Sequence, residues 1–138
     1  MRVLLSCYAC SPHKGSEPGV GWNMAVALAH ENEVWVLTRE KNKADIDDYI
    51  RKKPIENLHF CYHDCSKAVK LIKKASDFIY YQLWNLSAIS KVKRLIADNS
   101  IDIIHHITFN QYRSLSFGYF CDKPFVIGPV GGAELIDA

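Results

Sequence analysis

The stretch from Arg2 to Thr38 reads RVLLSCYACSPHKGSEPGVGWNMAVALAHENEVWVLT. It predicts, in order, a strand, a loop, a helix and a second strand, over residues 2–8, 9–19, 21–30 and 33–38. The first strand is indicated by a continuous apolar run, and the helix by Trp22, Ala25 and Ala29, which fall on one face at helical spacing. A strand, a helix and a strand in this order are typical of a parallel sheet that helices cover.

The rest of the chain continues this alternation. Further strands are expected over residues 58–62, 101–108 and 124–128, and helices over residues 43–53, 67–99 (one long helix, or two with a break near 85–87) and 111–120. The predicted fold class is therefore α/β, a Rossmann-like open parallel sheet with helices on both faces, in which the first strand lies beside the second and the fourth.

Length and composition fit one ordinary domain. The chain has 138 residues, 49% of them hydrophobic, with 17 basic and 15 acidic side chains and a formal net charge of +2. This composition argues against a disordered chain, and a charge so near balance predicts no nucleic-acid partner. The apolar start is too short for a signal peptide, no stretch reaches the roughly 18 apolar residues of a membrane span, and the five cysteines fit reduced thiols, so a cytoplasmic location is expected.

Two glycine-rich segments follow predicted strands. Residues 15–21 (GSEPGVG) precede a helix, where glycine lets a ligand approach the backbone and the helix N-terminus favours an anion such as phosphate. Residues 128–134 (GPVGGAE) follow the last strand. Segments of this kind at the carboxyl ends of parallel strands are typical ligand sites, although each also fits a plain structural turn. An NADP site is an alternative for the first, with Arg39 on the 2′-phosphate, but Met24 replaces the expected third glycine.

Two adjacent histidines, His105 and His106, end the predicted fourth strand. Neighbouring strand residues point to opposite faces, so only one of them is expected to face a ligand crevice, where a neutral imidazole donates to a sugar hydroxyl or a phosphate oxygen. The alternative for either is a core histidine that is bonded internally.

The remaining candidates are cysteines and a lysine-rich tract. A zinc site from Cys7, Cys10, Cys61 and Cys65 is not expected, because a strand separates the two pairs and Zn–S bonds are about 2.3 Å long. Lysines flank apolar positions at helical spacing in the predicted long helix, namely Val69, Ile72, Ile79, Leu83 and Leu86. This pattern predicts a buried stripe with solvated lysines, with contact to an anionic membrane surface as the alternative.

Four motifs in one order span nearly the whole chain: residues 15–23 (GSEPGVGWN), 81–84 (YQLW), 102–109 (DIIHHITF) and 124–134 (PFVIGPVGGAE). Together they resemble the N-terminal domain of a family 4 (group 1) glycosyltransferase of the GT-B type. The chain departs from the family pattern in its adjacent histidines and in Ala133, where a third glycine is expected.

The resemblance implies the acceptor-side half of a retaining glycosyltransferase, which moves a sugar from a nucleotide-sugar donor to a glycan or lipid-linked acceptor in cell-surface polysaccharide synthesis. It implies that Gly19 and Gly21 lie against the donor phosphates and that His105 or His106 lies near the transferred sugar. The residues implied on the acceptor side of the cleft are Glu17, Arg113, Gly131, Gly132 and Glu134. No metal or other cofactor is expected.

The donor-binding half of the family, with its spaced glutamate pair, has no counterpart in residues 1–138. We therefore expect a C-terminal domain as a partner in a longer chain and no transfer by this domain alone. The lysine-rich tract adds peripheral contact with a membrane as a further expectation. Two other functions stay open on the sequence: an NADP-dependent oxidoreductase and a non-catalytic interaction module.

Overall fold

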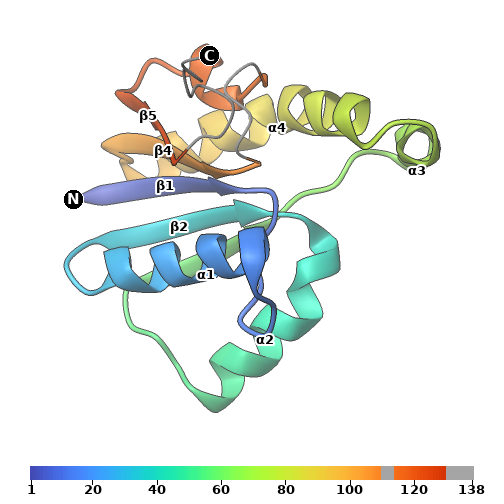
Figure 1. The fold of residues 1–138 in the computed structure, drawn as a ribbon. Helices are drawn as coiled ribbons and strands as arrows, with labels where there is room; N and C mark the ends of the chain where they lie inside the picture. Colours follow the sequence, from blue (N-terminus) through green and yellow to red (C-terminus); the bar gives the residue numbers. More distant parts are fainter. Residues whose placement is uncertain (110–113, 130–138) are drawn as a thin grey trace, which may run out of the picture.

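A computed structural model describes residues 1–109 and 114–129 of the chain. It contains one five-stranded sheet in the order β3-β2-β1-β4-β5 (Figure 1). The strands are β1 (Arg2–Cys7), β2 (Glu33–Thr38), β3 (Leu58–Tyr62), β4 (Ile103–Thr108) and β5 (Phe125–Ile127). The helices are α1 (Ser16–Ala29), α2 (Lys43–Lys52), α3 (Lys67–Lys70) and α4 (Asp77–Asn99), with 3₁₀ turns η1 (Glu40–Asn42), η2 (Leu71–Lys74) and η3 (Phe117–Phe120).

All neighbouring strands are parallel, and β1 pairs with β2 on one side and β4 on the other. The predicted α/β class, the parallel sheet and the central place of the first strand are thus confirmed. The chain turns back at β1, going first outward to β3 and then across to β4, so the loops after β1 and β4 diverge from a switch point.

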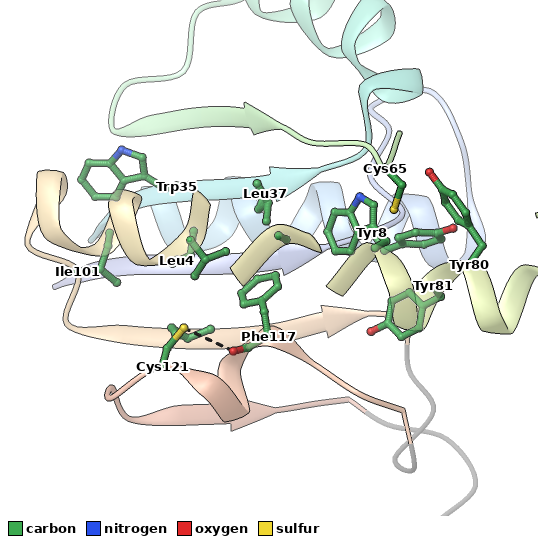
Figure 2. Close-up of a cluster of buried hydrophobic side chains, with 14 residues drawn as sticks. Leu4, Tyr8, Trp35, Leu37, Cys65, Tyr80, Tyr81, Ile101, Phe117 and Cys121 are labelled. Carbon is green, nitrogen blue, oxygen red and sulfur yellow. Dashed lines mark hydrogen bonds between the residues drawn. The ribbon is translucent and has the colours of Figure 1, made fainter. Parts of the chain in front are cut away.

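Helices cover both faces of the sheet (Figure 1). On one face α1 and α2 bury Trp22, Ala25 and Ile46 against residues such as Val34 and Val36. On the other face α4 packs a stripe at helical spacing against the sheet and η3, and Figure 2 shows this cluster. The buried α4 residues are Tyr80, Tyr81, Trp84, Asn85, Ala88 and Val92. Alternating side chains of each strand therefore serve two separate cores.

The first helix begins earlier than the sequence predicted. Residues 9–19 were expected to form a loop, but α1 starts at Ser16 and includes both Gly19 and Gly21. Pro18 does not prevent this, because the N–H groups of the first helical turn have no partner within the helix and proline costs nothing there.

The long helical tract breaks in a different place from the one expected. Residues 85–87 lie inside α4, and the break falls at Ala75 and Ser76. Asn85 does not interrupt the helix, because its Nδ2 donates to the carbonyl oxygen of Tyr81 at 3.1 Å. Ser76 begins the new helix, since its hydroxyl accepts a hydrogen bond from the N–H of Ile79 at 3.2 Å, an N-cap.

The predicted apolar stripe is only partly buried. Val69 and Leu83 pack against the core, but Ile72, Ile79 and Leu86 are exposed. The prediction was wrong because α4 turns a different stripe inward, the aromatic one that begins at Tyr80. The helix expected over residues 111–120 appears, in the described part, only as the turn η3.

Candidate functional site

The loops after β1 and β4 are bonded to each other at the carboxyl edge of the sheet. The N–H of Tyr8 donates to the Thr108 carbonyl oxygen at 3.2 Å, and the N–H of Ala9 donates to Thr108 Oγ1 at 3.1 Å. Thr108 Oγ1 in turn donates to the carbonyl oxygen of Ala9 at 2.8 Å. This buried exchange fixes the two loops at the switch point, where open α/β sheets bind ligands.

A cavity of about 310 Å³ opens beside these loops. Its walls come from the ends of β1, β2 and β4, from the first turn of α1, and from η2 with the start of α4. The lining residues are Tyr8, Ala9, Glu17, Pro18, Arg39, Lys41, Lys73, Asp77 and Phe109. We call this the carboxyl-edge cavity.

Arg39 is the most deeply placed charge in this cavity, with 7% of its surface exposed. Its Nε donates to the carbonyl oxygen of Tyr8 at 3.1 Å, and its guanidinium carbon lies 3.8 Å from the centroid of the Tyr8 ring. Burial lowers the pKa of Arg39, and Tyr8 acts in the opposite direction. The guanidinium is therefore held against an aromatic face, and Arg39 lines the cavity.

Two lysines lie close to Arg39. Lys41 and Lys73 line the same cavity, and with Arg39 they also line a smaller neighbouring one of about 190 Å³. Burial lowers the pKa of Lys41, and Arg39 and Lys73 lower it further by repulsion. Within residues 1–109 and 114–129, none of the three cations makes an ion pair within 4.0 Å. Two carboxylates, Glu17 and Asp77, line the cavity with these three cations, so its lining carries one more positive than negative charge.

An aromatic cluster separates this cavity from the histidines. Tyr8 meets the rings of Tyr81, Trp84 and Phe109 edge to face, at centroid distances of 5.0, 5.2 and 5.9 Å. Phe109 stacks on Tyr81 at 4.5 Å and also lines the cavity. The cluster makes one wall of the cavity apolar and rigid.

His106 is buried on the α4 side of the sheet, with 3% exposed. Its Nε2 donates to the carbonyl oxygen of Phe109 at 2.9 Å and lies 3.3 Å from Tyr81 Oη. Burial lowers the pKa of the imidazole, while the bond to Phe109 acts in the other direction. The ring is therefore neutral at pH 7, with its proton on Nε2. Its Nδ1 has no hydrogen-bond partner in the part of the chain that the structure describes.

His105 lies one residue earlier on β4 and, by strand alternation, on the opposite face. It is half-buried, and its Nε2 donates to the carbonyl oxygen of Gly128, after β5, at 2.9 Å. Of the two histidines it is the one with an accessible ring. Neither of them lines the carboxyl-edge cavity.

The glycines of α1 bring the helix close to the chain's own backbone. A Cβ at Gly19 would lie 2.6 Å from the carbonyl oxygen of Lys14, and one at Gly21 would lie 2.4 Å from that of Ala9. The faces that a dinucleotide fingerprint opens to a pyrophosphate are thus filled by protein. This packing argues against NADP binding at this segment.

The predicted cleft residues divide into two groups. Glu17, in the first turn of α1, lines the carboxyl-edge cavity together with Arg39. The other four, Arg113, Gly131, Gly132 and Glu134, lie outside the described residues.

Of the lining residues, the sequence analysis named only Glu17 and Arg39 as candidates. Besides Ala9 and Pro18, it missed five residues with polar or aromatic side chains: Tyr8, Lys41, Lys73, Asp77 and Phe109. Tyr8 ends a predicted strand, Phe109 directly follows one and Lys41 comes three residues after one. This placement could have found them, because strand ends meet at one edge of a parallel sheet. Lys73 and Asp77 carried no such signal, since their position depends on how η2 and α4 fold back.

No cluster of three or more metal-ligating side chains occurs within the described ranges. All five cysteines are free thiols. Burial raises the pKa of Cys10 to about 12 and raises that of Cys7, so both thiols stay protonated at neutral pH.

Comparison of the chain with family models, with curated proteins and with solved structures finds no match. Among the described residues, no helix combines the length and the apolar character needed to span a membrane.

Proposed function

We propose that this chain is the acceptor-side domain of a retaining GT-B glycosyltransferase, and that it works together with a donor-binding domain. The observation that carries the proposal is the polar carboxyl edge of the sheet, where a cavity, three cations and two histidines gather around the switch point of a Rossmann-like fold. The motifs in residues 15–23, 81–84, 102–109 and 124–134 add the resemblance to this family.

The two histidines take different roles in this proposal. His105 contacts the transferred sugar, since its ring is accessible and the bond to the Gly128 carbonyl fixes its tautomer and leaves Nδ1 as an acceptor. His106 holds the loop that follows β4 through the carbonyl of Phe109. The protein supplies positioning and hydrogen bonds, and the leaving diphosphate is stabilised by cationic side chains and helix N-termini.

Contact with a membrane belongs to the proposal as well. Four large apolar side chains are exposed around η2 and the start of α4, namely Leu71, Ile72, Phe78 and Ile79, with exposures from 37 to 65%. Lysines at positions 67, 70, 73 and 74 lie in the same segment. We call these apolar residues and lysines the α3–α4 patch. Exposed apolar groups among lysines suit an anionic lipid surface. We therefore propose that the enzyme is cytoplasmic and binds a membrane peripherally through this patch.

Transfer is tested with the complete product of the reading frame and with the 138-residue chain in parallel. Each is incubated with a panel of nucleotide sugars and a glycolipid extract, and products are identified by mass spectrometry. We expect the complete product to glycosylate an acceptor and the 138-residue chain to be inactive, because the donor diphosphate is held by the other domain.

Nucleotide binding provides the second readout. Calorimetric titration of the 138-residue chain with nucleoside diphosphates is expected to show weak binding or none. A micromolar dissociation constant would contradict the acceptor-side assignment, and so would a complete product with no domain beyond this one and no transfer.

A further inference from the structure

The hydrogen-bonding capacity of the Arg39 guanidinium is only partly used within the described residues. Arg39 is nine-tenths buried, and none of the described residues accepts a hydrogen bond from its two terminal nitrogens. Asp64 and Asp77 attract this guanidinium, but no ion pair within 4.0 Å joins it to a described carboxylate. Buried donors without an acceptor are costly, and the cost falls when an anion accepts from them. Lys41 and Lys73 line the same space, so an anion placed there meets three cations at once.

The geometry of Arg39 suits a phosphoryl group. Its Nε is occupied by the Tyr8 carbonyl, and the ring of Tyr8 supports the guanidinium plane. The outer nitrogens are thereby fixed in orientation before a ligand arrives, and a guanidinium edge matches two phosphate oxygens. The two lysines add mobile point charges of the kind that bind a third oxygen.

The cavity holds more than an inorganic ion. Its volume of about 310 Å³ lies at the lower end of the range for small-molecule pockets, about 300–1,000 Å³. Glu17 and Asp77 line it too, and carboxylates accept hydrogen bonds from hydroxyl groups. Tyr8 and Phe109 offer ring faces or edges for the C–H groups of a sugar or polyol.

We propose that the carboxyl-edge cavity binds a phosphorylated sugar or polyol, with the phosphoryl group on Arg39, Lys41 and Lys73 and the hydroxyl groups toward Glu17 and Asp77. The binding stands on the cavity alone, whereas identifying this ligand as the acceptor rests on the proposed function. The substrate class it adds is a phosphorylated acceptor.

Calorimetry with three probes tests the binding: glucose 6-phosphate, glucose and inorganic phosphate. Glucose 6-phosphate is expected to bind about tenfold more tightly than glucose, as a charge-assisted contact to phosphate predicts. It is also expected to bind more tightly than inorganic phosphate, because the cavity contacts the sugar. Equal affinity for glucose and its phosphate, or no binding of any probe, would overturn the proposal.

Substitutions locate the site. Lys41→Met and Lys73→Met are each expected to weaken glucose 6-phosphate binding several-fold, while Lys52→Met, which removes an exposed charge paired with Asp48 on α2, leaves it unchanged. Arg39→Met is expected to have the largest effect, and circular dichroism checks its fold because Arg39 is buried. Unchanged affinity in both lysine variants would overturn the assignment, whatever happens to Arg39→Met.

The phosphoryl group that this cavity binds can belong to a soluble sugar phosphate or to a lipid headgroup, and one experiment distinguishes the two. Phosphatidylcholine vesicles containing phosphatidic acid are added to the complex with glucose 6-phosphate. Displacement identifies a headgroup, and persistence identifies a soluble ligand. Either result supports the phosphoryl site, and neither depends on sugar transfer, so failure of the transfer assay leaves this test intact.

Discussion

The carboxyl ends of β2 and β4 lie on one edge of the sheet, but their polar side chains differ in how far the protein satisfies their hydrogen bonds and charge. At the end of β4, His105 and His106 each give an imidazole N–H to a backbone carbonyl, on Gly128 and Phe109 respectively. At the end of β2, Arg39 has no ion pair among the residues that the structure describes, and two lysines line the cavity beside it.

The difference suits the two strand ends to different tasks: the β4 end to positioning reacting groups and the β2 end to binding an anion. Groups whose hydrogen bonds are met by the protein are held in place before any ligand arrives, as a reacting site requires. Cationic groups whose N–H donors lack an acceptor gain most from an anionic ligand, as an anchoring site requires. The loop after β1 joins the two ends, because Tyr8 bonds to both Arg39 and Thr108.

The sharpest way to separate the two ends is to compare the histidines in the complete enzyme. His105→Ala is expected to lower kcat by about 100-fold or more, because the Nδ1 acceptor that positions the transferred sugar in the transition state is lost. His106→Gln is expected to cost less than about tenfold, because glutamine can still donate to the Phe109 carbonyl and keep the loop in place. Steady-state transfer rates at neutral pH check both.

Two results would contradict this division of roles. Full activity in both variants would remove the histidines from the site altogether. A larger loss in His106→Gln than in His105→Ala would exchange their roles.

A substitution in α1 is expected to disturb both ends together. In Gly21→Ala the new Cβ would meet the carbonyl oxygen of Ala9 at 2.4 Å, so the shared loop must shift, at a cost of about 1–3 kcal/mol in the free energy of unfolding. Gly15→Ala is the matched control, since nothing lies within 4 Å of its Cβ position. Urea denaturation compares the two, and equal stability would show that Gly21 does not fix the loop.

Low pH is expected to lower the free energy of unfolding through His106, at the end of β4. Burial lowers the pKa of this imidazole in the folded protein, and that of His63 as well, so the unfolded chain binds protons more readily. The stabilisation is complete above the ordinary value of 6.5 and is lost as the pH falls below it. Unfolding free energies measured along this range should fall with pH, less steeply in His106→Gln; identical slopes would argue against a neutral, buried His106.

The smallest expected effect concerns lipid. The wild-type chain should co-sediment with vesicles that contain phosphatidylglycerol and much less with pure phosphatidylcholine. Leu71→Ser, in the α3–α4 patch, should reduce the bound fraction, whereas Val20→Ser, a comparably exposed apolar change on α1, should not. Equal loss in both variants, or no preference for anionic vesicles, would remove the patch from the membrane proposal.

The sequence predicted the sheet well, because apolar runs and helical spacing report burial directly. The apolar run at Val3 to Leu5 and the helix face with Trp22 both lie in the core, as expected. The first strand also lies between the second and the fourth, as predicted. The position of the break in the helical tract was predicted wrongly. Asn85 and Ser87 suggested a break because the sequence does not show their hydrogen-bond partners. In the structure Asn85 bonds within α4 and also to the N–H of Phe117.

The site was harder to predict than the fold. Glu17 was expected at the cleft and does line the cavity, but Lys73 and Asp77 reach it only through the turn between η2 and α4. Gly19 and Gly21 suggested a phosphate loop because glycine permits close approach, and sequence does not say what approaches. In the structure a Cβ at either position would meet a backbone carbonyl oxygen, which is a structural reason for glycine there; contact with donor phosphates stays a prediction.

The contrast between the two strand ends is tested most directly by NMR of the 15N-labelled chain during titration with inorganic phosphate. We predict shifts of the Arg39 Nε–H signal and of the backbone amides of Tyr8, Lys41 and Lys73, with the ring signals of His105 and His106 unmoved. Shifts confined to the histidines, or none at millimolar phosphate, would contradict the account.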